Sequence, residues 1–449
     1  MATKVLIVGG GASGVLLAIH LSRDGADAFH VTILERRPSL GAGVAYATNQ
    51  PDHLLNVRAS NMSAFPDDPG HFAHWLQGQD AAGPAGTCGP DSFAPRHRYR
   101  DYLGSLLEPL VADGRLLHIQ AEAISVRDTK VGVEIASSDG VRHFGGIAVI
   151  ATNEGPGLPA EPWRFEGWTD GGHPDLAPDA PVVVVGTGLT MVDRVLSLLQ
   201  NGHVGNITAV SRRGLPPQVH RPATAQAIDG EAIPFGQSAS HLTGWIRQRT
   251  RTAERMGLDW RSVVDAMRPH TQTLWHQLPL AERGRFLRHA RPYWDVHRHR
   301  IAPDAARQLE MAKQRGQLQI IAAHVAEFVP QGTGVEVRIA RRGAGSHETI
   351  HAEAVFECRG RVPSIAQSEN PVLRDMLRTG LARPDALGLG LAVTTDCAVI
   401  DITGNVSDRC YAVGPVTSGT FWEIVAIPDI RQQAQLLARH LSIRTRDPG

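Results

Sequence analysis

The feature that most constrains this chain is a glycine-rich turn between a short apolar strand and a helix near its start. Val5–Val8 has the composition of a buried strand, and Gly9, Gly11 and Gly14 follow in a G-x-G-x-x-G pattern that opens a helix. The next strand ends at Glu35. These glycines allow a tight turn, a close approach of a diphosphate and close helix packing, while the acid accepts hydrogen bonds from a ribose. The pattern predicts a Rossmann-like nucleotide-binding half.

The same arrangement recurs in the middle of the chain. A strand over 182–185 is followed by Gly186 and Gly188 and by a helix with apolar residues at helical spacing. The next strand ends in Ser211-Arg212-Arg213, where the first half has an acid. A hydroxyl and two guanidinium groups suit a 2′-phosphate, so this half is predicted to bind NADPH in preference to NADH. An arginine pair on a solvated turn is the alternative.

Two such halves in one chain predict a protein that binds FAD in the first and NADPH in the second. We expect an α/β fold of two Rossmann-like dinucleotide-binding domains, in which the NADPH domain interrupts the FAD domain and carries a helical insertion. The expected FAD domain comprises residues 1–178 and 346–449, and the NADPH domain comprises 179–345 with the insertion at about 216–316. Short strands are expected between 116 and 150, a linker over 155–179, separate strands over 318–322 and 326–329, and a closing helix from about Phe421 to Leu441.

Composition argues against several other classes. Lys+Arg and Asp+Glu both number 45, and zero formal charge is atypical of proteins that bind nucleic acid or anionic membranes. The chain has no run of ~18 apolar residues and no secretory leader before its first strand, so we expect a cytoplasmic protein. Its four cysteines are scattered without C-x-x-C or zinc spacing, which argues against a redox-active disulfide and a metal site.

One polar run, His297-Arg298-His299-Arg300, is interpreted as an extended stretch with both histidines on one side. Two histidines alone do not make a metal site. Two interpretations remain: recognition of an anion, either a phosphate of NADPH or an acidic substrate, and a structural polar turn.

Further strings accompany the glycine motifs: Gly41–Tyr46, His53–Val57, Asn61–Phe65, Phe93–Arg96, Ser211–Gly214, Tyr293–Arg300 and Gly419–Glu423. With them the chain resembles the two-dinucleotide-binding-domain flavoproteins over nearly its whole length. Within these it resembles a bacterial group of FAD/NAD(P)-binding proteins that includes an FAD-dependent urate hydroxylase. That group is related to N-hydroxylating and Baeyer–Villiger-type monooxygenases.

Two positions depart from the family pattern. The alanine–threonine–glycine turn ends here in Asn153, and the F-x-G-x-x-x-H signature appears only as Phe165 and Gly167 with His173 two residues late. These departures favour a looser monooxygenase assignment over Baeyer–Villiger chemistry in the strict sense.

The resemblance also implies which residues hold the cofactors. The first turn would hold the ADP half of FAD, the segment 56–63 would run beside the flavin ring, and the turn at 414 would meet the ribityl chain and pyrimidine edge. The implied FAD residues are Gly9, Gly11, Ala12, Ser13, Gly14, Glu35, Arg36, Asn56, Met62, Ser63, Gly414 and Trp422. The implied NADPH residues are Gly186, Gly188, Leu189, Thr190, Ser211, Arg212 and Arg213.

The function implied is that of an FAD-containing, NADPH-dependent oxidoreductase, a single-component monooxygenase. It would act through a flavin C4a-hydroperoxide on a small polar or nitrogen-containing substrate, with molecular oxygen as co-substrate. Two alternatives remain: an NADPH dehydrogenase that passes electrons to a quinone, an imine or a redox partner, and a non-catalytic dinucleotide-binding sensor. The sequence identifies no catalytic residue, and His53, Asp295, His297 and Glu423 are candidates only because they lie in the strings above. It does not determine the oligomeric state.

Overall fold

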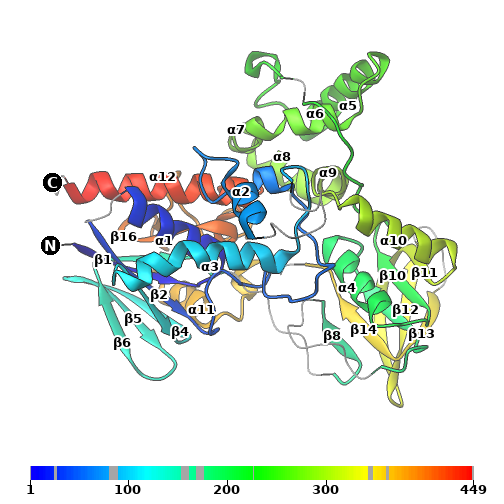
Figure 1. Ribbon diagram of the computed structural model, residues 1–449, viewed down its shortest axis with the longest axis horizontal. Helices are drawn as coiled ribbons and strands as arrows, with labels where there is room; N and C mark the ends of the chain where they lie inside the picture. The colour runs from blue at the N-terminus through cyan, green and yellow to red at the C-terminus, as the bar shows by residue number, and fades with distance from the viewer. Residues whose placement is uncertain are drawn as a thin grey trace. The chain divides into compact units, whose positions relative to one another are not determined.

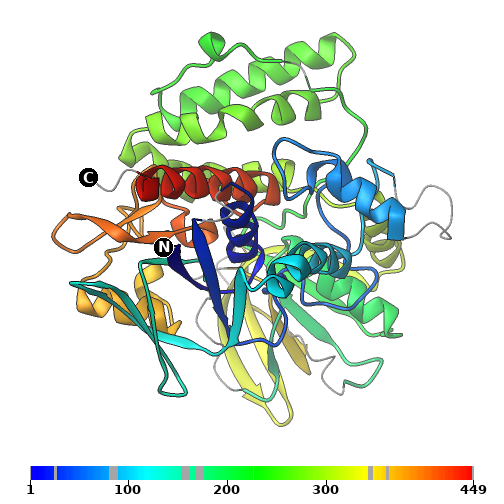
Figure 2. The ribbon, with the colours of Figure 1, turned by 60° about the vertical axis from the view of Figure 1, so that its left-hand side comes forward.

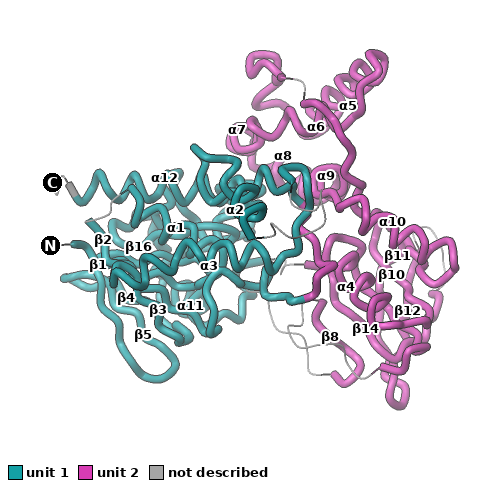
Figure 3. Tube along the Cα trace, in the orientation of Figure 1, with its two compact units in different colours: residues 1–49, 57–156, 361–449 teal, residues 50–56, 157–360 magenta. Residues whose placement is uncertain are grey.

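The chain folds as two compact units, one interrupting the other (Figures 1 and 3). The computed structural model describes residues 2–24, 28–79, 89–152, 161–167, 176–225, 227–341, 347–360 and 364–446. Unit 1 comprises residues 1–49, 57–156 and 361–449, and unit 2 comprises residues 50–56 and 157–360. Parallel sheets with helices in both units confirm the predicted α/β fold class.

Unit 1 is built on a mostly parallel sheet, in which the apolar segment at the start of the chain is an inner strand and only the edge strand β15 is antiparallel. In β1, Val5, Leu6 and Ile7 are completely buried, as expected of a strand covered on both faces. Its neighbours β2 and β7 run parallel to it. The six strands of this sheet, in spatial order, are β15 (Ala398–Ile400), β16 (Val406–Ala412), β7 (Ile147–Ile150), β1 (Thr3–Val8), β2 (Phe29–Glu35) and β3 (Leu116–Gln120).

Helices and a second, antiparallel sheet complete unit 1. Helix α1 (Ala12–Asp24) packs against α3 (Arg96–Ala112) and α12 (Ile427–Arg446), and α2 (His71–Gln79) also contacts α3. The small sheet contains β4 (Ala123–Thr129), β5 (Gly132–Ser137) and β6 (Arg142–Gly145), and α11 (Pro371–Thr379) packs on β4. Helix α11 has clear boundary signals, because the Asn370 side chain accepts from the backbone of Leu373 and Gly380 ends the helix at φ +77°.

Unit 2 contains a sheet that is parallel at one end and antiparallel at the other. Its strands, in spatial order, are β13 (His347–Ala352), β12 (Gly334–Arg341), β11 (Leu318–Gln331), β10 (Ile207–Ser211), β9 (Val182–Val185), β14 (Ala354–Glu357) and β8 (Arg164–Glu166). The four valines of β9 are buried, and the strand runs parallel to β10 and β14. Helix α4 (Leu189–Gln200) follows β9 and packs against α10 (Pro303–Gln314).

The expected helical insertion lies between β10 and β11, and Figure 2 shows its helices in green to yellow-green; the last of them, α10, packs against α4. Short helices with polar outer faces make up this part of unit 2. They are α5 (Ala239–Arg255), α6 (Arg261–Ala266), α7 (Thr271–Gln277), α8 (Leu280–Arg285), a π-helical turn over Phe286–Ala290, α9 (Arg291–Arg298) and α10.

The structure corrects two expected helix and strand boundaries. The closing helix begins at Ile427, not at about Phe421, because Glu423 has φ +63° and no right-handed helix can pass through that conformation. The strands expected over 318–322 and 326–329 are one strand, β11, with a register shift between Val325 and Glu327. A β-bulge of this kind re-aims a strand without ending it.

The unit boundaries differ from the expected domain boundaries for a reason that only strand pairing reveals. β14 pairs with β9, so unit 2 extends to Gly360, beyond the expected limit at 345. β8 lies within the segment expected to be a linker and pairs with β14, so this part is an edge strand. Residues 50–56 belong to unit 2 although the flanking chain belongs to unit 1.

Candidate dinucleotide-binding sites

The first glycine turn has backbone geometry that larger residues could not adopt. Gly9 has φ +105°, and a Cβ atom on it would lie 2.9 Å from the carbonyl oxygen of Ala151. A Cβ atom on Gly14 would overlap the carbonyl oxygen of Gly9 and lie 3.1 Å from Cγ2 of Ile7. The turn leads directly into α1. The first turn of this helix has no acidic residue, so no side-chain charge there would repel a phosphate.

Glu35 is held at the end of β2 beside this turn. One carboxylate oxygen accepts from the Gly10 backbone at 2.7 Å, and the other accepts from the Arg37 backbone at 3.0 Å. Each oxygen keeps a lone pair for a ribose hydroxyl. Arg36 is exposed, and its guanidinium lies 3.8 Å from the carboxylate of Glu122. The acid thus occupies the position that the sequence predicts for it.

A second glycine turn closes over the first. The Gly41 backbone donates to the Gly10 carbonyl at 2.8 Å, and a Cβ atom on Gly43 would lie 3.2 Å from the Cα atom of Gly11. A Cβ atom on Gly11 would lie 3.4 Å from the Cα atom of Gly43, so the two turns are in direct contact. The sequence pointed to this second turn only through the string Gly41–Tyr46.

Gly414 lies against the start of α1. It has φ +74°, and a Cβ atom on it would overlap the hydroxyl of Ser13. Its backbone N–H donates to Oε1 of Gln433 at 2.7 Å, and its carbonyl accepts from the Thr417 hydroxyl at 2.7 Å. Gln433 also donates to that hydroxyl at 3.0 Å. Sequence analysis missed Thr417 and Gln433, which have no local motif.

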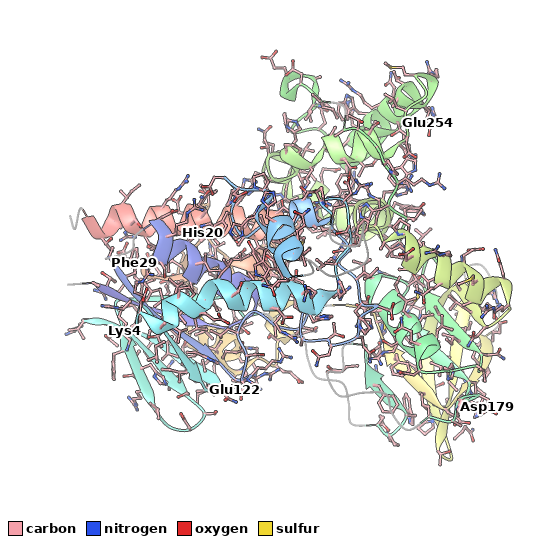
Figure 4. The ribbon with its side chains drawn as sticks, in the orientation of Figure 1. Lys4, His20, Phe29, Glu122, Asp179 and Glu254 are labelled. Carbon is pink, nitrogen blue, oxygen red and sulfur yellow. The ribbon has the colours of Figure 1, made fainter. Side chains whose placement is uncertain are left out.

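The segment after Val57 is anchored from two helices. The Ser63 carbonyl accepts from Nη1 of Arg431 in α12 at 2.8 Å, and the next carbonyl, that of Ala64, lies 3.1 Å from Nε2 of His20 in α1 (Figure 4). Burial lowers the pKa of His20, so the ring is neutral at pH 7 and its Nε2–H donates. Met62, Ser63 and Trp422 are buried residues of unit 1. Asn56 falls in unit 2, where its carbonyl lies 3.0 Å from Nε2 of His220.

In unit 2, the turn after β9 repeats the geometry of the first. Gly186 has φ +118°, and a Cβ atom on it would overlap the carbonyl group of Cys358. A Cβ atom on Gly188 would meet nothing within 4 Å, and this residue is exposed at the start of α4. Leu189 and Thr190 follow it in a first turn without acidic residues. The open space above Gly188 and the bare helix start suit a diphosphate.

Ser211, the last residue of β10, and the two arginines that follow it differ in the groups that they offer a ligand. The Thr187 hydroxyl donates its single proton to the Leu215 carbonyl at 2.8 Å. The Ser211 hydroxyl lies 2.8 Å from the Thr187 hydroxyl, and it must therefore be the donor of that hydrogen bond. Ser211 also accepts from the Gly214 backbone. Arg213 donates to the carbonyls of Arg288 and His289 at 3.3 Å and lies 5.5 Å above the ring of Tyr293. Arg212 is exposed, so its guanidinium is accessible to a ligand.

The four candidate acid–base residues are divided between the units: His53, Asp295 and His297 belong to unit 2 and Glu423 to unit 1. His53 lies beside α4, with Nε2 2.6 Å from the Ser197 hydroxyl and 3.2 Å from the Asp193 carbonyl. Asp295 and His297 lie together on α9, and Glu423 is a buried residue of unit 1. His297 places Nδ1 2.7 Å from the carbonyl of Tyr293. These contacts hold local structure, and they assign no catalytic residue.

The interpretation of residues 297–300 as an extended stretch is wrong. Helix α9 runs to Arg298, with Pro292 in its first turn and an Arg291–Asp295 ion pair along its surface, both of which favour a helix. His297 is therefore helical, whereas His299 has left the helix. Arg300 is buried and donates to Asp265.

The burial of His299 predicts an acid-sensitive element in the insertion. Burial, reinforced by Arg298, lowers the pKa of His299 to about 3, so the folded state keeps the ring neutral where the unfolded state protonates it. The contribution of neutral His299 to the free energy of unfolding is complete above pH 6.5, the ordinary pKa, and is lost as the pH falls toward 3. Replacing His299 by Gln should make this loss shallower by up to about 1.4 kcal/mol per pH unit. Urea unfolding at pH 7, 6, 5 and 4 measures it, and identical slopes in both proteins would contradict the assignment.

The cysteines of the described segments are not arranged for thiol chemistry. Cys358, Cys397 and Cys410 are free and buried. Burial raises the pKa of each thiol to about 12, so none is a thiolate at pH 7. In the same segments, no three metal-ligating side chains gather, and no helix is long and apolar enough to span a membrane.

Comparison with known proteins agrees with this architecture. Over the whole chain, the fold matches ornithine N-hydroxylase of Kutzneria sp. 744, at 16% identity, a TM-score of 0.67 and coverage of 99% of this chain and 100% of that one. L-lysine 6-monooxygenase from Pseudomonas syringae matches at 16% identity, a TM-score of 0.64 and the same coverage. T. acidophilum thioredoxin reductase matches less well, at 15% identity, a TM-score of 0.52 and 99% coverage of both chains. No curated protein sequence matches this chain.

The chain thus has the fold of the two-dinucleotide-binding-domain flavoproteins. Residues 6–155 match a family model described as FAD-NAD(P)-binding, and this match covers the first glycine turn, Glu35 and the segment through Ser63. These residues are similar to an FAD-NAD(P)-binding domain.

Proposed function

We propose that the protein is an FAD-containing, NADPH-dependent oxidoreductase, and specifically a monooxygenase that hydroxylates a small polar or nitrogen-containing substrate. The observation that carries the proposal is that two separate glycine turns are accompanied by side chains of opposite charge at the end of the next strand. One is completed by the carboxylate of Glu35 and the other by the exposed guanidinium of Arg212. A carboxylate suits a ribose hydroxyl and would repel a 2′-phosphate, whereas a guanidinium attracts one.

In this proposal the residues of unit 1 bind and orient FAD. Gly9, Gly11 and Gly14 admit the diphosphate to the start of α1, Glu35 holds the ribose, and the buried network at Gly414 fixes the backbone beside Ser13. Bound flavin would supply hydride acceptance and reaction with oxygen. In unit 2, Gly188 admits the second diphosphate and Arg212 selects NADPH.

A monooxygenase is favoured over a dithiol reductase by the state of the three cysteines that the structure describes. A dithiol reductase needs a thiol that readily forms a thiolate. Cys358, Cys397 and Cys410 are buried with pKa values raised to about 12. The ornithine and lysine hydroxylases also give higher TM-scores than the thioredoxin reductase. Ornithine and lysine, which their names give as substrates, are small and nitrogen-containing, as is the substrate proposed for this chain.

The test is an anaerobic stopped-flow experiment. The purified yellow protein is reduced with NADPH and then mixed with oxygenated buffer, and absorbance is followed across the flavin spectrum. A transient species that absorbs at shorter wavelength than oxidised flavin supports a monooxygenase. Failure of NADPH to bleach the flavin would overturn the oxidoreductase proposal and leave a dinucleotide sensor.

An NADPH dehydrogenase shares both nucleotide sites and is distinguished by the fate of oxygen. Reactions under labelled oxygen with a panel of small amines and other polar compounds should place the label in a hydroxylated product. Peroxide as the only oxygen product, together with rapid reduction of an added quinone, would assign the dehydrogenase.

A further inference from the structure

One arginine side chain connects the end of β10 to the helical insertion. Nη2 of Arg213 donates to the carbonyls of Arg288 and His289, each at 3.3 Å. Both carbonyls belong to the π-helical turn that leads into α9. Pro292 lies four residues after Arg288 and has no N–H group, so it cannot be the α-helical donor to the Arg288 carbonyl. Arg213 supplies a donor in its place and thereby holds the start of α9 beside the end of β10.

The same guanidinium lies over an aromatic ring that is open to solvent. Tyr293 follows Pro292 in the first turn of α9, and Cζ of Arg213 lies 5.5 Å from the centroid of the Tyr293 ring. A cation over an aromatic ring occupies one of its two faces. Tyr293 is nevertheless 53% exposed. Arg213 thus fixes the ring from one side, and more than half of the residue's surface stays accessible to a ligand.

A short series of contacts within unit 2 connects this ring to the glycine turn after β9. The hydroxyl of Thr187, in that turn, lies 2.8 Å from the hydroxyl of Ser211 at the end of β10. The Ser211 hydroxyl also accepts from the Gly214 backbone at 3.0 Å, so the chain turns tightly through Arg213. In a Rossmann half the diphosphate lies at the glycine turn and the adenosine ribose at the end of the next strand. Adenine is bonded to that ribose, so it lies near the end of β10, where Arg213 holds the ring of Tyr293.

We propose that the adenine ring of NADPH stacks on Tyr293, on the face opposite Arg213. Adenine is a flat, uncharged ring, and an accessible aromatic side chain of fixed orientation is the group that recognises it. This contact uses a part that NADPH and NADH share, whereas the exposed guanidinium of Arg212 pairs with the 2′-phosphate that only NADPH has. The helical insertion thereby supplies part of the nucleotide site. The inference rests on the binding of NADPH by unit 2, which the proposed function also requires.

The decisive measurement is the affinity of the full-length, FAD-loaded protein for NADP⁺, determined by calorimetric titration of the wild type and of Tyr293→Ala. We expect affinity to fall about 5- to 150-fold in Tyr293→Ala, as for loss of one base–aromatic stack. Tyr293→Phe keeps the ring and should bind NADP⁺ as the wild type does. Wild-type affinity in Tyr293→Ala would overturn the inference. An equal loss in Tyr293→Phe would overturn it too, because phenylalanine stacks on a base as tyrosine does.

Cofactors that differ in their adenosine part show which group the ring contacts. Anaerobic flavin reduction is measured at increasing concentrations of NADPH, NADH and reduced nicotinamide mononucleotide. In Tyr293→Ala the half-saturating concentrations of NADPH and NADH should rise by the same factor, since both contain adenine. The value for the mononucleotide should not change, because it has no adenosine. A loss confined to NADPH would assign Tyr293 to the 2′-phosphate and overturn the adenine assignment.

Trp245 in α5 provides the matched control. Cζ of Arg249 lies 5.0 Å from its ring centroid, so the insertion contains a second cation–π pair, and α5 lies away from β10 (Figure 1). Trp245→Ala should leave NADP⁺ affinity unchanged, and equal losses in Trp245→Ala and Tyr293→Ala would overturn the inference. If Tyr293→Ala does not fold, Tyr293→Leu replaces it in each comparison, since leucine keeps an apolar side chain beside Arg213. A wild type that binds no NADP⁺ overturns the proposed function itself.

Discussion

Replacing Gly14 by alanine should yield a folded protein that no longer retains FAD. The added Cβ atom would overlap the carbonyl oxygen of Gly9, which is backbone and cannot rotate away as a side chain could. The turn must therefore move away from the start of α1. Such overpacking costs about 1–3 kcal/mol, and the displaced backbone donors add to the loss. We expect FAD affinity to fall about 100-fold or more, as measured by flavin content after purification and by FAD titration.

Gly104→Ala is the matched control for this prediction. Gly104 lies inside α3 in the same unit, and a Cβ atom there would meet nothing within 4 Å. Alanine also favours the helix by roughly 1 kcal/mol. This variant should bind FAD normally and melt at the same or a higher temperature. If Gly14→Ala retains FAD as well as Gly104→Ala does, the first turn is not the FAD site.

Replacing Arg212 by alanine should remove the preference for NADPH. A charge-assisted hydrogen bond to phosphate contributes about 1.5–3 kcal/mol, so the NADPH concentration needed for half-maximal flavin reduction should rise about 10- to 100-fold. The value for NADH should change little, because NADH has no 2′-phosphate. Flavin reduction at increasing concentrations of each cofactor measures both values.

Arg213→Ala provides the comparison within the same turn. Arg213 already donates to the carbonyls of Arg288 and His289, so its loss should loosen the insertion more than it alters cofactor preference. We expect a lower melting temperature and a smaller change in the NADPH-to-NADH ratio than for Arg212→Ala. Equal losses of NADPH and NADH in the Arg212 variant would exclude the 2′-phosphate assignment.

Both glycine turns could be predicted because strand–turn–helix units of this kind have a recognisable residue spacing. Only Gly14 is constrained from within its own unit, by the Gly9 carbonyl, whereas Gly9 and Gly186 approach the carbonyls of Ala151 and Cys358, which lie far along the chain. The residue at the end of the strand after the first turn was equally informative, since the Glu35 carboxylate accepts a hydrogen bond from Gly10 in that turn. Pattern alone could not reveal that Ser211 has no proton left for a ligand, because that depends on Thr187 and Leu215.

Errors arose where a backbone conformation or a distant strand overrides the pattern of residue types. The apolar residues after Gly419 resemble a helix start, yet the backbone at Glu423 prevents it. The segment at 164–166 has the composition of a linker and becomes a strand only because β14 lies beside it. His297 and Arg298 alternate as in a strand, but they end a helix that begins at Arg291 and has Pro292 in its first turn.

By itself, then, the sequence determined the two nucleotide-binding turns, the α/β class and the contrast between Glu35 and Arg212, because each depends on residues close together in the chain. Only the tertiary structure showed that Nε of Arg431 on α12 and the hydroxyl of Tyr99 on α3 are buried without hydrogen-bond partners. It alone showed how Gln433 fixes the turn at Gly414. Burial and hydrogen-bond satisfaction depend on what the rest of the fold places around a side chain, and no spacing of residues encodes that.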